Sequence, residues 1–418
     1  MKKVENVVCT GCALTCNDIV VILEGNSVIE VWGSCSHGTK RIKELERERL
    51  KCSEDDIDTA IEKAVSILAS AKKPLIYGFS SSLNRSIEIG LKIAEKVNGV
   101  FDSPPSICHI HIPLAKKNEI KNVKLEEVLE KSDFIMYFFA NIADTHLRHA
   151  SRYTIFPRGE VIKSGRESRT VLAIDYFENE NMKIAQHRII VKPGMEIDFL
   201  KRLRESISTG KIPSLDELEI TLESWAILLD DIKKSTFISA FAGPHILSNI
   251  MSREIYRELI SLVKAISATG RESSLIPLAE DLNSMGAALI PYKLLGATHA
   301  IEFSNGNPIR NPTTTNASSK LLSGEVDAAL IVGSDPYVHL PRSIVKRLKE
   351  IPIIYVGERK TIVAKISEVN IPTAINGIES GGTIFRIDGE EIELIPFIKP
   401  PEGIESEDKV LKKILAKL

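Results

Sequence analysis

Four of the six cysteines in this chain lie near its start, with a spacing that suits a metal site. Cys9, Cys12 and Cys16 fall within eight residues and Cys35 follows, which gives the pattern C-x2-C-x3-C-x18-C. Three thiolates on a tight turn can hold one face of an iron–sulfur cubane, and a fourth completes the ligand set of a [4Fe–4S] cluster. Structural zinc is the alternative, because four cysteines also bind zinc tetrahedrally. Zinc ribbons usually present two separate C-x2-C pairs, and Cys35 has no such neighbour, so the spacing favours iron–sulfur.

The two remaining cysteines differ in their surroundings. Cys52 stands alone beside charged residues, and we interpret it as incidental. Cys108 follows two prolines on a loop and precedes His109. A lone cysteine in a core is more often structural than reactive. A loop position beside a histidine favours a metal ligand or a nucleophile instead, and both interpretations remain open for Cys108.

Several polar clusters follow apolar runs and could bind a phosphate or a pterin. Arginine can pair with pyrophosphate through two hydrogen bonds, and glycines allow a ligand to approach the backbone closely. Each cluster also has a structural interpretation, as a solvated helix start or an ordinary loop. No G-x-G-x2-G or P-loop motif is present, which disfavours simple use of NAD or ATP. The candidate cofactor-binding residues in these clusters are Asn141, Arg148, His149, Asp175, Asn305, Gly306, Gly333, Ser334, Asp335, Gly381 and Gly382.

The elements that must position these residues alternate between strands and helices. Residues 19–22 and 28–32 are predicted to be two strands joined by a turn at 24–27. Residues 56–69 place apolar side chains on one helical face, and 87–97 and 250–266 are further predicted helices. Short apolar runs between such helices indicate a parallel sheet that is covered on both faces. These predicted strands are 74–78, 133–139, 170–175, 187–191, 236–240, 328–333 and 351–357.

The strand pattern begins twice, which predicts an α/β protein with two Rossmann-like units. We expect a small iron–sulfur domain at 1–50, a first α/β domain at 51–230 and a second at 231–418. Ligands of such sheets sit outside the carboxyl ends of the strands. The residues that follow Gly78, Ala140, Asp175, Gly333 and Gly357 are therefore the expected ligand contacts.

Composition and charge are those of an ordinary globular protein. The chain has 418 residues, 43% of them hydrophobic, and a formal net charge of −2. This balance gives no reason to expect nucleic acid or an anionic membrane as a partner. No signal peptide is visible and the apolar runs are too short to cross a bilayer, so we expect a cytoplasmic protein.

Taken together and in order, the motifs resemble those of the B-subunit family of formylmethanofuran dehydrogenases, within the molybdopterin oxidoreductase superfamily. The resemblance extends over nearly the whole chain. The matching motifs are Cys9-x2-Cys12-x3-Cys16-Asn17-Asp18-Ile19, Cys35-x2-Gly38-x-Lys40, Ser106-Ile107-Cys108-His109, Leu147-Arg148-His149, Phe303-Ser304-x-Gly306-x-Pro308, Ser334-Asp335-Pro336, Gly377-Ile378-Glu379-x-Gly381-Gly382-Thr383 and Arg386-x-Asp388-Gly389.

The resemblance implies a set of cofactors and roles. It implies one [4Fe–4S] cluster on the four early cysteines, and two molybdopterin guanine dinucleotides that hold tungsten or molybdenum. Cys108 would be the protein ligand of that metal, and His109 would handle protons beside it. Lys40 would lie between the cluster and a pterin. The implied reaction is the reversible reduction of CO2 to formate.

The resemblance also implies partner subunits. These are a zinc amidohydrolase-like A subunit, a C subunit, a D subunit that carries the pterin-binding barrel missing from this chain, and ferredoxin-like electron donors. Two positions depart from the family pattern. Ile110 and His111 follow His109 where the family has Gly-Pro, and Glu280 and Asp281 stand where a cation is expected. Carboxylates oppose an anion, so a related oxidoreductase with a different substrate is one alternative, and a non-catalytic electron-relay subunit is another.

Overall fold

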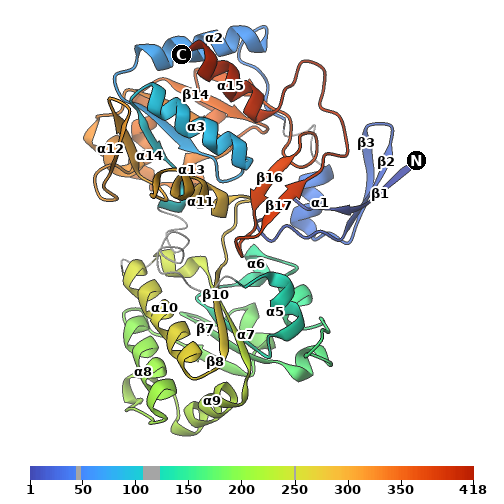
Figure 1. Ribbon diagram of the computed structural model, residues 1–418, viewed down its shortest axis with the longest axis vertical. Coiled ribbons are helices and arrows are strands. Elements are labelled where there is room, and N and C mark those ends of the chain that lie inside the picture. Colours follow the sequence, from blue (N-terminus) through green and yellow to red (C-terminus); the bar gives the residue numbers. More distant parts are fainter. Residues whose placement is uncertain (44–48, 107–122, 249–250) are drawn as a thin grey trace. The chain divides into compact units, whose positions relative to one another are not determined.

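The computed structural model describes residues 1–43, 49–106, 123–248 and 251–418. The chain forms two compact units, which Figure 1 shows as ribbons. Unit 1 consists of Met1–His109, Asp281–Arg386 and Glu391–Leu418, and unit 2 of Ile110–Glu280 and Ile387–Glu390. Each unit contains a parallel sheet with helices, so the predicted α/β fold is confirmed.

Unit 1 begins with a small antiparallel sheet that carries the cysteines in its connections. Its described strands are β1 (Lys2–Val7), β2 (Ile19–Glu24) and β3 (Ser27–Trp32), in the order β1-β2-β3. In β2 alternate residues are buried, as expected for a strand with one face on a core. The predicted hairpin at 19–32 is confirmed. Helix α1 (Ser36–Lys43) follows directly after Cys35.

The large sheet of unit 1 contains parallel strands flanked by an antiparallel hairpin. In the described residues its order is β12-β11-β5-β4-β13-β14-β15. The strands β4, β5, β13, β14 and β15 are parallel, whereas β11 runs antiparallel to β5. Their bounds are β4 (Pro74–Gly78), β5 (Val100–Asp102), β11 (Ile301–Ser304), β12 (Asn307–Arg310), β13 (Ala328–Val332), β14 (Ile353–Gly357) and β15 (Val369–Pro372).

Helices cover both faces of the large sheet. Helix α15 (Glu407–Lys417) packs on both α2 (Ile57–Ser70) and α3 (Asn84–Lys96), and α2 and α3 also contact strands of the sheet. Side chains of α12 (Ala317–Ser323) and α14 (Arg342–Val345) join a second core with alternate residues of β4 and β13. The other elements of this unit are η1 (Pro104–Ser106), α11 (Ser284–Leu295), α13 (Pro336–His339), η6 (Lys346–Glu350), η7 (Val363–Lys365), β16 (Gly382–Phe385) and β17 (Glu391–Leu394).

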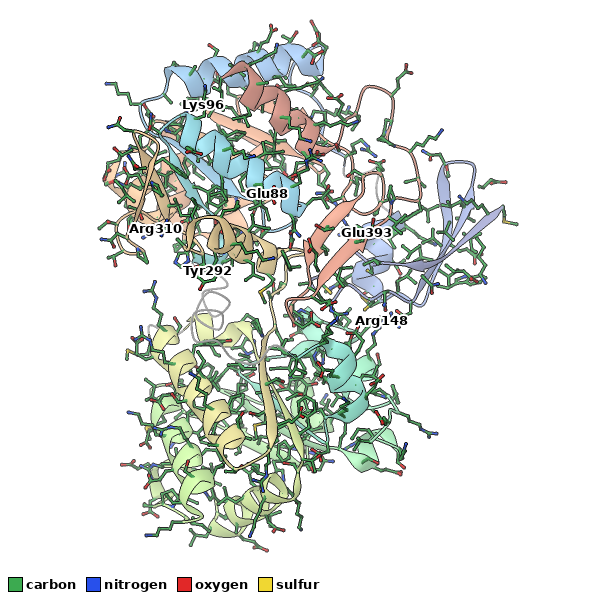
Figure 2. The ribbon with its side chains drawn as sticks, in the orientation of Figure 1. Glu88, Lys96, Arg148, Tyr292, Arg310 and Glu393 are labelled. Atoms are coloured by element: carbon green, nitrogen blue, oxygen red, sulfur yellow. The ribbon has the colours of Figure 1, made fainter. Side chains whose placement is uncertain are left out.

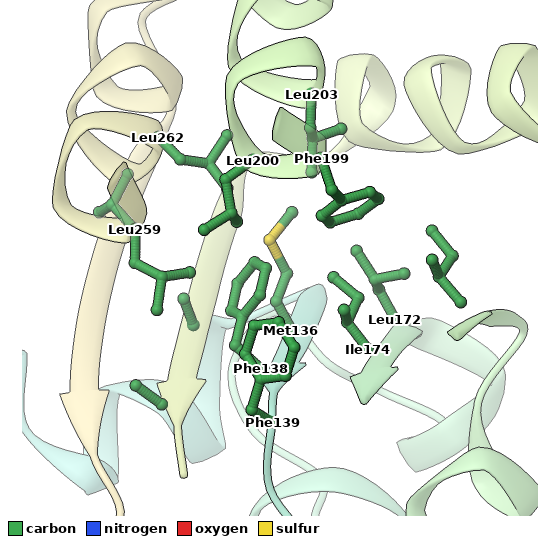
Figure 3. Packing of buried hydrophobic residues seen from close by; sticks show 14 of the residues in the cluster. Met136, Phe138, Phe139, Leu172, Ile174, Phe199, Leu200, Leu203, Leu259 and Leu262 are labelled. Carbon is green, nitrogen blue, oxygen red and sulfur yellow. The ribbon is translucent and has the colours of Figure 1, made fainter. Parts of the chain in front are cut away.

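Unit 2 is a parallel sheet with helices on it. Its strands in the described residues have the order β10-β9-β6-β7-β8. Figure 3 shows how Met136 and Phe138 of β6 pack on Leu200 and Leu203 of α8, and this cluster is the core of the unit. The strands are β6 (Phe134–Phe138), β7 (Thr170–Asp175), β8 (His187–Ile190), β9 (Phe237–Ala242) and β10 (Glu272–Pro277). The helices are α5 (Leu125–Lys131), α6 (Ile142–Thr145), η2 (Ala150–Thr154), η3 (Gly165–Ser168), α7 (Glu180–Ile184), α8 (Glu196–Thr209), η4 (Asp216–Leu218), α9 (Leu222–Lys234), η5 (Pro244–Ser248) and α10 (Ser252–Ala268).

The predicted domain boundaries at 51–230 and 231–418 are wrong. Strand β4 pairs in parallel with β13, more than two hundred residues later, and β6 pairs with β9 across the expected boundary. The chain therefore leaves the large sheet after β5, builds unit 2, and returns to complete unit 1. Apolar runs indicate that strands exist, but their order in a sheet depends on packing between distant segments, which periodicity does not record. No helix in the described residues is both long and apolar enough to span a membrane.

Candidate functional site

The cysteine loop lies between β1 and β2 and folds back on itself. The Cys9 N–H donates to the Cys16 carbonyl at 2.8 Å, and the Thr15 N–H donates to the Cys12 carbonyl at 3.2 Å. Cys35 lies between β3 and α1, and its carbonyl accepts a hydrogen bond from the Thr39 N–H at 2.8 Å. Three cysteines therefore share one short turn, and the fourth is held at the start of a helix.

Two glycines allow the start of α1 to approach this loop. A Cβ atom on Gly38 would lie 2.6 Å from Cys9 Sγ, and a Cβ atom on Gly11 would lie 3.0 Å from Gly38 Cα. Any larger residue at position 38 would push the loop and the helix apart. Lys40, the predicted residue between cluster and pterin, lies on the same helix with an exposed side chain.

The cysteine thiols act on one another electrostatically. Burial raises the pKa of Cys9 to about 12, and the nearby thiols of Cys16 and Cys35 also raise it, whereas the Gly11 N–H and Arg41 oppose the rise. Burial likewise raises the pKa of Cys12 to about 12, with a contribution from the other three thiols. Four mutually repelling thiolates need bound cations to form here, which iron would supply.

The loop has features that suit a [4Fe–4S] cluster. The N–H groups of Gly11 and Leu14 donate to the sulfurs of Cys9 and Cys12, and hydrogen bonds of this kind stabilise cluster thiolates. Thr15 Oγ1 is buried and has no hydrogen-bond partner among the described residues. A buried hydroxyl without a partner indicates a missing acceptor nearby. As the four thiols stand, the described residues contain no group of three or more His, Cys, Asp or Glu side chains that could hold a metal ion.

A second set of polar groups gathers where β4, β13 and β14 end side by side in unit 1. Gly333 has a φ of +56°, and a Cβ atom there would lie 2.6 Å from Ser82 Oγ and 3.1 Å from Glu407 Oε2. Burial raises the pKa of Glu407 to about 7, although the Ser86 and Ser82 hydroxyls oppose the rise. Sequence reasoning missed Glu407 because it belongs to the last helix, far from any motif.

A line of hydrogen-bonding side chains crosses the same edge. Ser80 Oγ lies 3.5 Å from Ser334 Oγ, and Ser334 Oγ lies 3.3 Å from His339 Nδ1. His339 Nε2 lies 3.0 Å from Asp281 Oδ2. Burial would lower the pKa of His339, but Asp281 and Asp335 outweigh it and hold that pKa above its ordinary value. The carboxylate that the sequence placed where a cation was expected is therefore paired with a histidine.

Asp102 organises the backbone that leads to Cys108. Its carboxylate accepts hydrogen bonds from the Ala317 N–H at 2.7 Å, the Ala300 N–H at 3.1 Å and Ser106 Oγ at 3.0 Å. Burial raises the pKa of Asp102 to about 6 against these donors. The neighbouring Ser103 Oγ is buried without a hydrogen-bond partner among the described residues. Cys108 and His109, the predicted catalytic pair, lie outside the described residues.

Other predicted cofactor contacts of unit 1 take part in the fold. Asp335 caps α13, where one carboxylate oxygen accepts from the Tyr337 N–H at 3.0 Å and the other from the Ile362 N–H at 2.7 Å. A Cβ atom on Gly381 would lie 2.8 Å from the Leu394 carbonyl, and Gly382 begins β16. A cofactor contact remains a prediction for Gly333, Ser334, Asp335, Gly381 and Gly382.

Asn305 and Gly306 lie on the opposite edge of the large sheet. They form the turn of the β11–β12 hairpin, with φ values of +51° and +74°, as a two-residue hairpin turn requires. Because β11 is antiparallel to β5, this turn falls at the amino end of β5, where the Gly306 N–H bonds Asn98 Oδ1 at 3.2 Å. Figure 2 shows Arg310 on the same hairpin. Asn305 and Gly306 are therefore turn residues at the end of the sheet away from the carboxyl edge, and a cofactor contact remains a prediction for them.

Unit 2 has its own polar edge, where β6 and β7 end. Asn141 follows β6, and its Oδ1 has no hydrogen-bond partner among the described residues, although the side chain is largely buried. Asp175 ends β7 and accepts from Asn179 Nδ2 at 2.6 Å and from His245 Nδ1 at 2.9 Å. The hydrogen bond to Asp175 raises the pKa of His245. Sequence reasoning missed His245, whose only signal is its position just after a strand.

The neighbouring residues Arg148 and His149 have different surroundings in the structure. Arg148 is partly exposed in the turn after α6 (Figure 2), and a cofactor contact remains a prediction for it. His149 is fully buried, with its Nδ1 3.1 Å from Tyr137 Oη and its ring 4.5 Å from that of Phe241. Burial holds the pKa of His149 well below its ordinary value. His149 Nε2 is buried without a hydrogen-bond partner among the described residues, and a cofactor contact remains a prediction for this residue.

Comparison with curated proteins identifies relatives over the full length of the chain. No family model matches the chain. It is 29% identical over 431 residues to the B subunit of the tungsten-containing formylmethanofuran dehydrogenase 2 of Methanococcus maripaludis. It is 29% identical over 434 residues to the protein of the same description from Methanocaldococcus jannaschii. Both alignments cover 100% of this chain and 99% of the relative, so the resemblance predicted from the motifs is confirmed.

Two solved structures share the fold. One is a chain of the formyltransferase/hydrolase complex of Methylorubrum extorquens in complex with methylofuran, with a TM-score of 0.68 and 19% identity. That match covers 87% of this chain and 96% of the other. The second is acetylene hydratase from Pelobacter acetylenicus, with a TM-score of 0.69 and 10% identity, covering 99% of this chain and 69% of that one. At such low sequence identities, the two structures show a shared fold and nothing beyond it.

Proposed function

We propose that this chain is the catalytic B subunit of a formylmethanofuran dehydrogenase, an oxidoreductase similar along its whole length to the two methanogen proteins. It would reduce CO2 reversibly to formate in the cytoplasm, as CO2 + H⁺ + 2 e⁻ ⇌ HCOO⁻. The main observation that supports this proposal is the closed loop that brings Cys9, Cys12 and Cys16 together with Cys35. The partners would be the A, C and D subunits of such a complex and ferredoxin-like electron donors.

The residues of the chain would have distinct tasks. Cys9, Cys12, Cys16 and Cys35 would hold a [4Fe–4S] cluster, and Cys108 would be the protein ligand of tungsten or molybdenum. When bound, that metal and its two pterin guanine dinucleotides would supply two-electron exchange with CO2 or formate. Ser82, Gly333 and Ser334 at the carboxyl edge of the large sheet, and Asn141 and Asp175 in unit 2, would contact the pterin cofactors. His109 would take or give the proton.

The pairing of Asp281 with His339 bears on the substrate. An unpaired carboxylate near the metal would repel formate, whereas the protonated form of His339, which Asp281 favours, offsets the charge of Asp281. This pairing weakens one of the two reasons to prefer an uncharged substrate. Glu280 is exposed, and after Asp175 it contributes to the raised pKa of His245.

Metal analysis tests the proposal first. The protein purified anaerobically from its native host should contain about four irons and one tungsten or molybdenum per chain. Cys12→Ser should lose most of the iron. The matched control is Cys52→Ser, because the Cys52 thiol contacts the Asp56 carbonyl and lies outside the loop. Zinc without iron or a pterin metal would contradict the proposal.

Measurements of catalytic turnover test whether formate is the substrate. Cys108→Ala should retain the iron and lose formate-dependent reduction of a viologen dye. The fold is shared with a hydratase and with a chain of a formyltransferase/hydrolase complex, so the fold alone does not decide the reaction. A fully metallated protein without formate activity would favour a related oxidoreductase with another substrate. A protein that contains iron but no pterin would favour an electron-relay subunit.

A further inference from the structure

Arg41 connects the cysteine loop to the large sheet through a buried set of polar contacts. It lies on α1, and its side chain is 10% exposed. Its Nε donates to Thr10 Oγ1 at 3.2 Å, and Thr10 directly follows Cys9 in the loop. Its Nη1 forms an ion pair with Glu358, which follows the last residue of β14. One guanidinium therefore contacts both the loop and the carboxyl edge of the sheet.

The charge of Arg41 lies beside the cysteine loop. Its guanidinium donates to the side chain of Thr10, the residue next to Cys9, so it can favour negative charge on the loop. A positive charge that stabilises a thiolate also stabilises any other negative charge at the same place. Because both side chains are largely buried, salt and water screen this interaction little.

Glu358 determines how much of that charge is compensated. Burial would raise the pKa of Glu358, but Arg41 and Arg359 outweigh it, so the carboxylate is ionised. Arg359 Nε lies 3.6 Å from Glu358 Oε1, and Arg359 Nη2 donates to the Arg41 carbonyl at 3.3 Å. Two guanidiniums thus share one carboxylate, so Glu358 is divided between Arg41 and Arg359.

The same carboxylate is connected to the other predicted ligand region. Glu358 Oε2 accepts a hydrogen bond from the Asn376 N–H at 3.1 Å, and Asn376 Nδ2 donates to the Ser81 carbonyl at 3.3 Å. Asn376 lies on the loop that leads to Gly381 and Gly382. A disturbance at Glu358 would therefore reach both the cysteine loop and this loop.

We propose that Arg41, partly compensated by Glu358, sets the reduction potential of the cluster held by the cysteine loop. This inference rests on the proposed [4Fe–4S] cluster. Reduction adds one negative charge to the cluster, and the nearby guanidinium stabilises that charge. Arg41 therefore raises the potential, whereas Glu358 lowers it by cancelling part of the positive charge. Arg41 is a tuning residue and touches no substrate.

The test is an anaerobic redox titration of the reduced-cluster EPR signal in the purified, metallated protein. Arg41→Leu removes the positive charge and should lower the midpoint potential. Glu358→Gln keeps the size and shape of the side chain but removes its negative charge, and it should raise the potential. We expect each shift to correspond to at least a tenfold change in the reduction equilibrium, which is ~59 mV for one electron.

Two variants serve as controls. Arg41→Lys keeps the charge but not the shape of the guanidinium, so its potential should stay near that of the wild type. Lys43→Leu removes the same charge from the same helix at an exposed position, where water screens it, and should leave the potential unchanged. A structural role of Arg41 alone would disturb Arg41→Lys as much as Arg41→Leu.

The outcomes separate this inference from the proposed function. A wild-type protein without an iron–sulfur EPR signal would refute the cluster itself. A normal cluster whose potential is the same in Arg41→Leu and Glu358→Gln as in the wild type would overturn the inference, and so would shifts of the same sign. If Arg41→Leu loses its iron, the comparison of Glu358→Gln with Arg41→Lys tests the inference instead. Glu358→Gln should raise the midpoint potential, whereas Arg41→Lys should leave it near that of the wild type.

Discussion

His339 Nε2 lies 3.0 Å from the Asp281 carboxylate, although the two residues come from different segments that meet at the carboxyl edge of the large sheet. The exposed fractions of the two side chains are 11% and 26%. His339 also reaches Ser334, so the pair connects a partly exposed carboxylate to a buried hydroxyl at the predicted ligand edge. This relationship leads to the first prediction.

Asp281→Asn should destabilise the protein in a pH-dependent way. The pKa of His339 is raised in the folded state, so the pair contributes stability below the ordinary histidine pKa and loses it as pH rises through the folded pKa. We expect a loss of roughly 1–3 kcal/mol in the free energy of unfolding near pH 6 and little loss near pH 9. Urea unfolding at the two pH values measures it. The exposed Asp55→Asn is the control, and an equal loss at both pH values would contradict the role of the ion pair.

Gly38→Ala should weaken cluster binding. The added Cβ would lie 2.6 Å from Cys9 Sγ, so the loop or the start of α1 must move. Changes beside metal ligands typically weaken metal binding by roughly 10–100-fold. Iron content after exposure to a chelator measures the effect. Ser36→Ala, at the exposed first position of the same helix, should retain its iron. Full retention of iron by Gly38→Ala would show that the loop accommodates the methyl group and that this close approach is not required.

Asp102→Asn should lower the content of tungsten or molybdenum and leave the iron content unchanged. The amide would present its NH2 group to one of the two backbone donors, Ala300 or Ala317, and the loop that begins at Ser103 would lose part of its anchor. We expect a loss of about 2–4 kcal/mol in stability and a lower content of tungsten or molybdenum, because the anchored segment leads to Cys108. Elemental analysis measures both metals in one sample.

The matched variant for Asp102 is Ser106→Ala. It removes one hydrogen bond from the same carboxylate and should cost only about 1 kcal/mol. An Asp102→Asn protein that loses iron and the pterin metal together would indicate general unfolding of unit 1 rather than a local effect on the Cys108 segment.

Local patterns in the sequence determined most of the elements. The run 170–175 and the turn at 24–27 appear in the structure as β7 and the β2–β3 hairpin. These features depend on residues within one or two turns of chain, because alternation and helical periodicity are properties of neighbouring residues. The spacing of Cys9, Cys12 and Cys16 is local in the same way, and it already indicated a shared site.

Only the tertiary structure decided which strand ends meet. It placed Glu407 beside Ser82 and His339 beside Asp281, and it moved Asn305 to the amino edge of the sheet and His149 into the core. The insertion of unit 2 between β5 and β11 also depends on long-range strand pairing. Such contacts form because packing brings distant segments together, and the free energy of that packing is shared among many residues rather than encoded in any one motif.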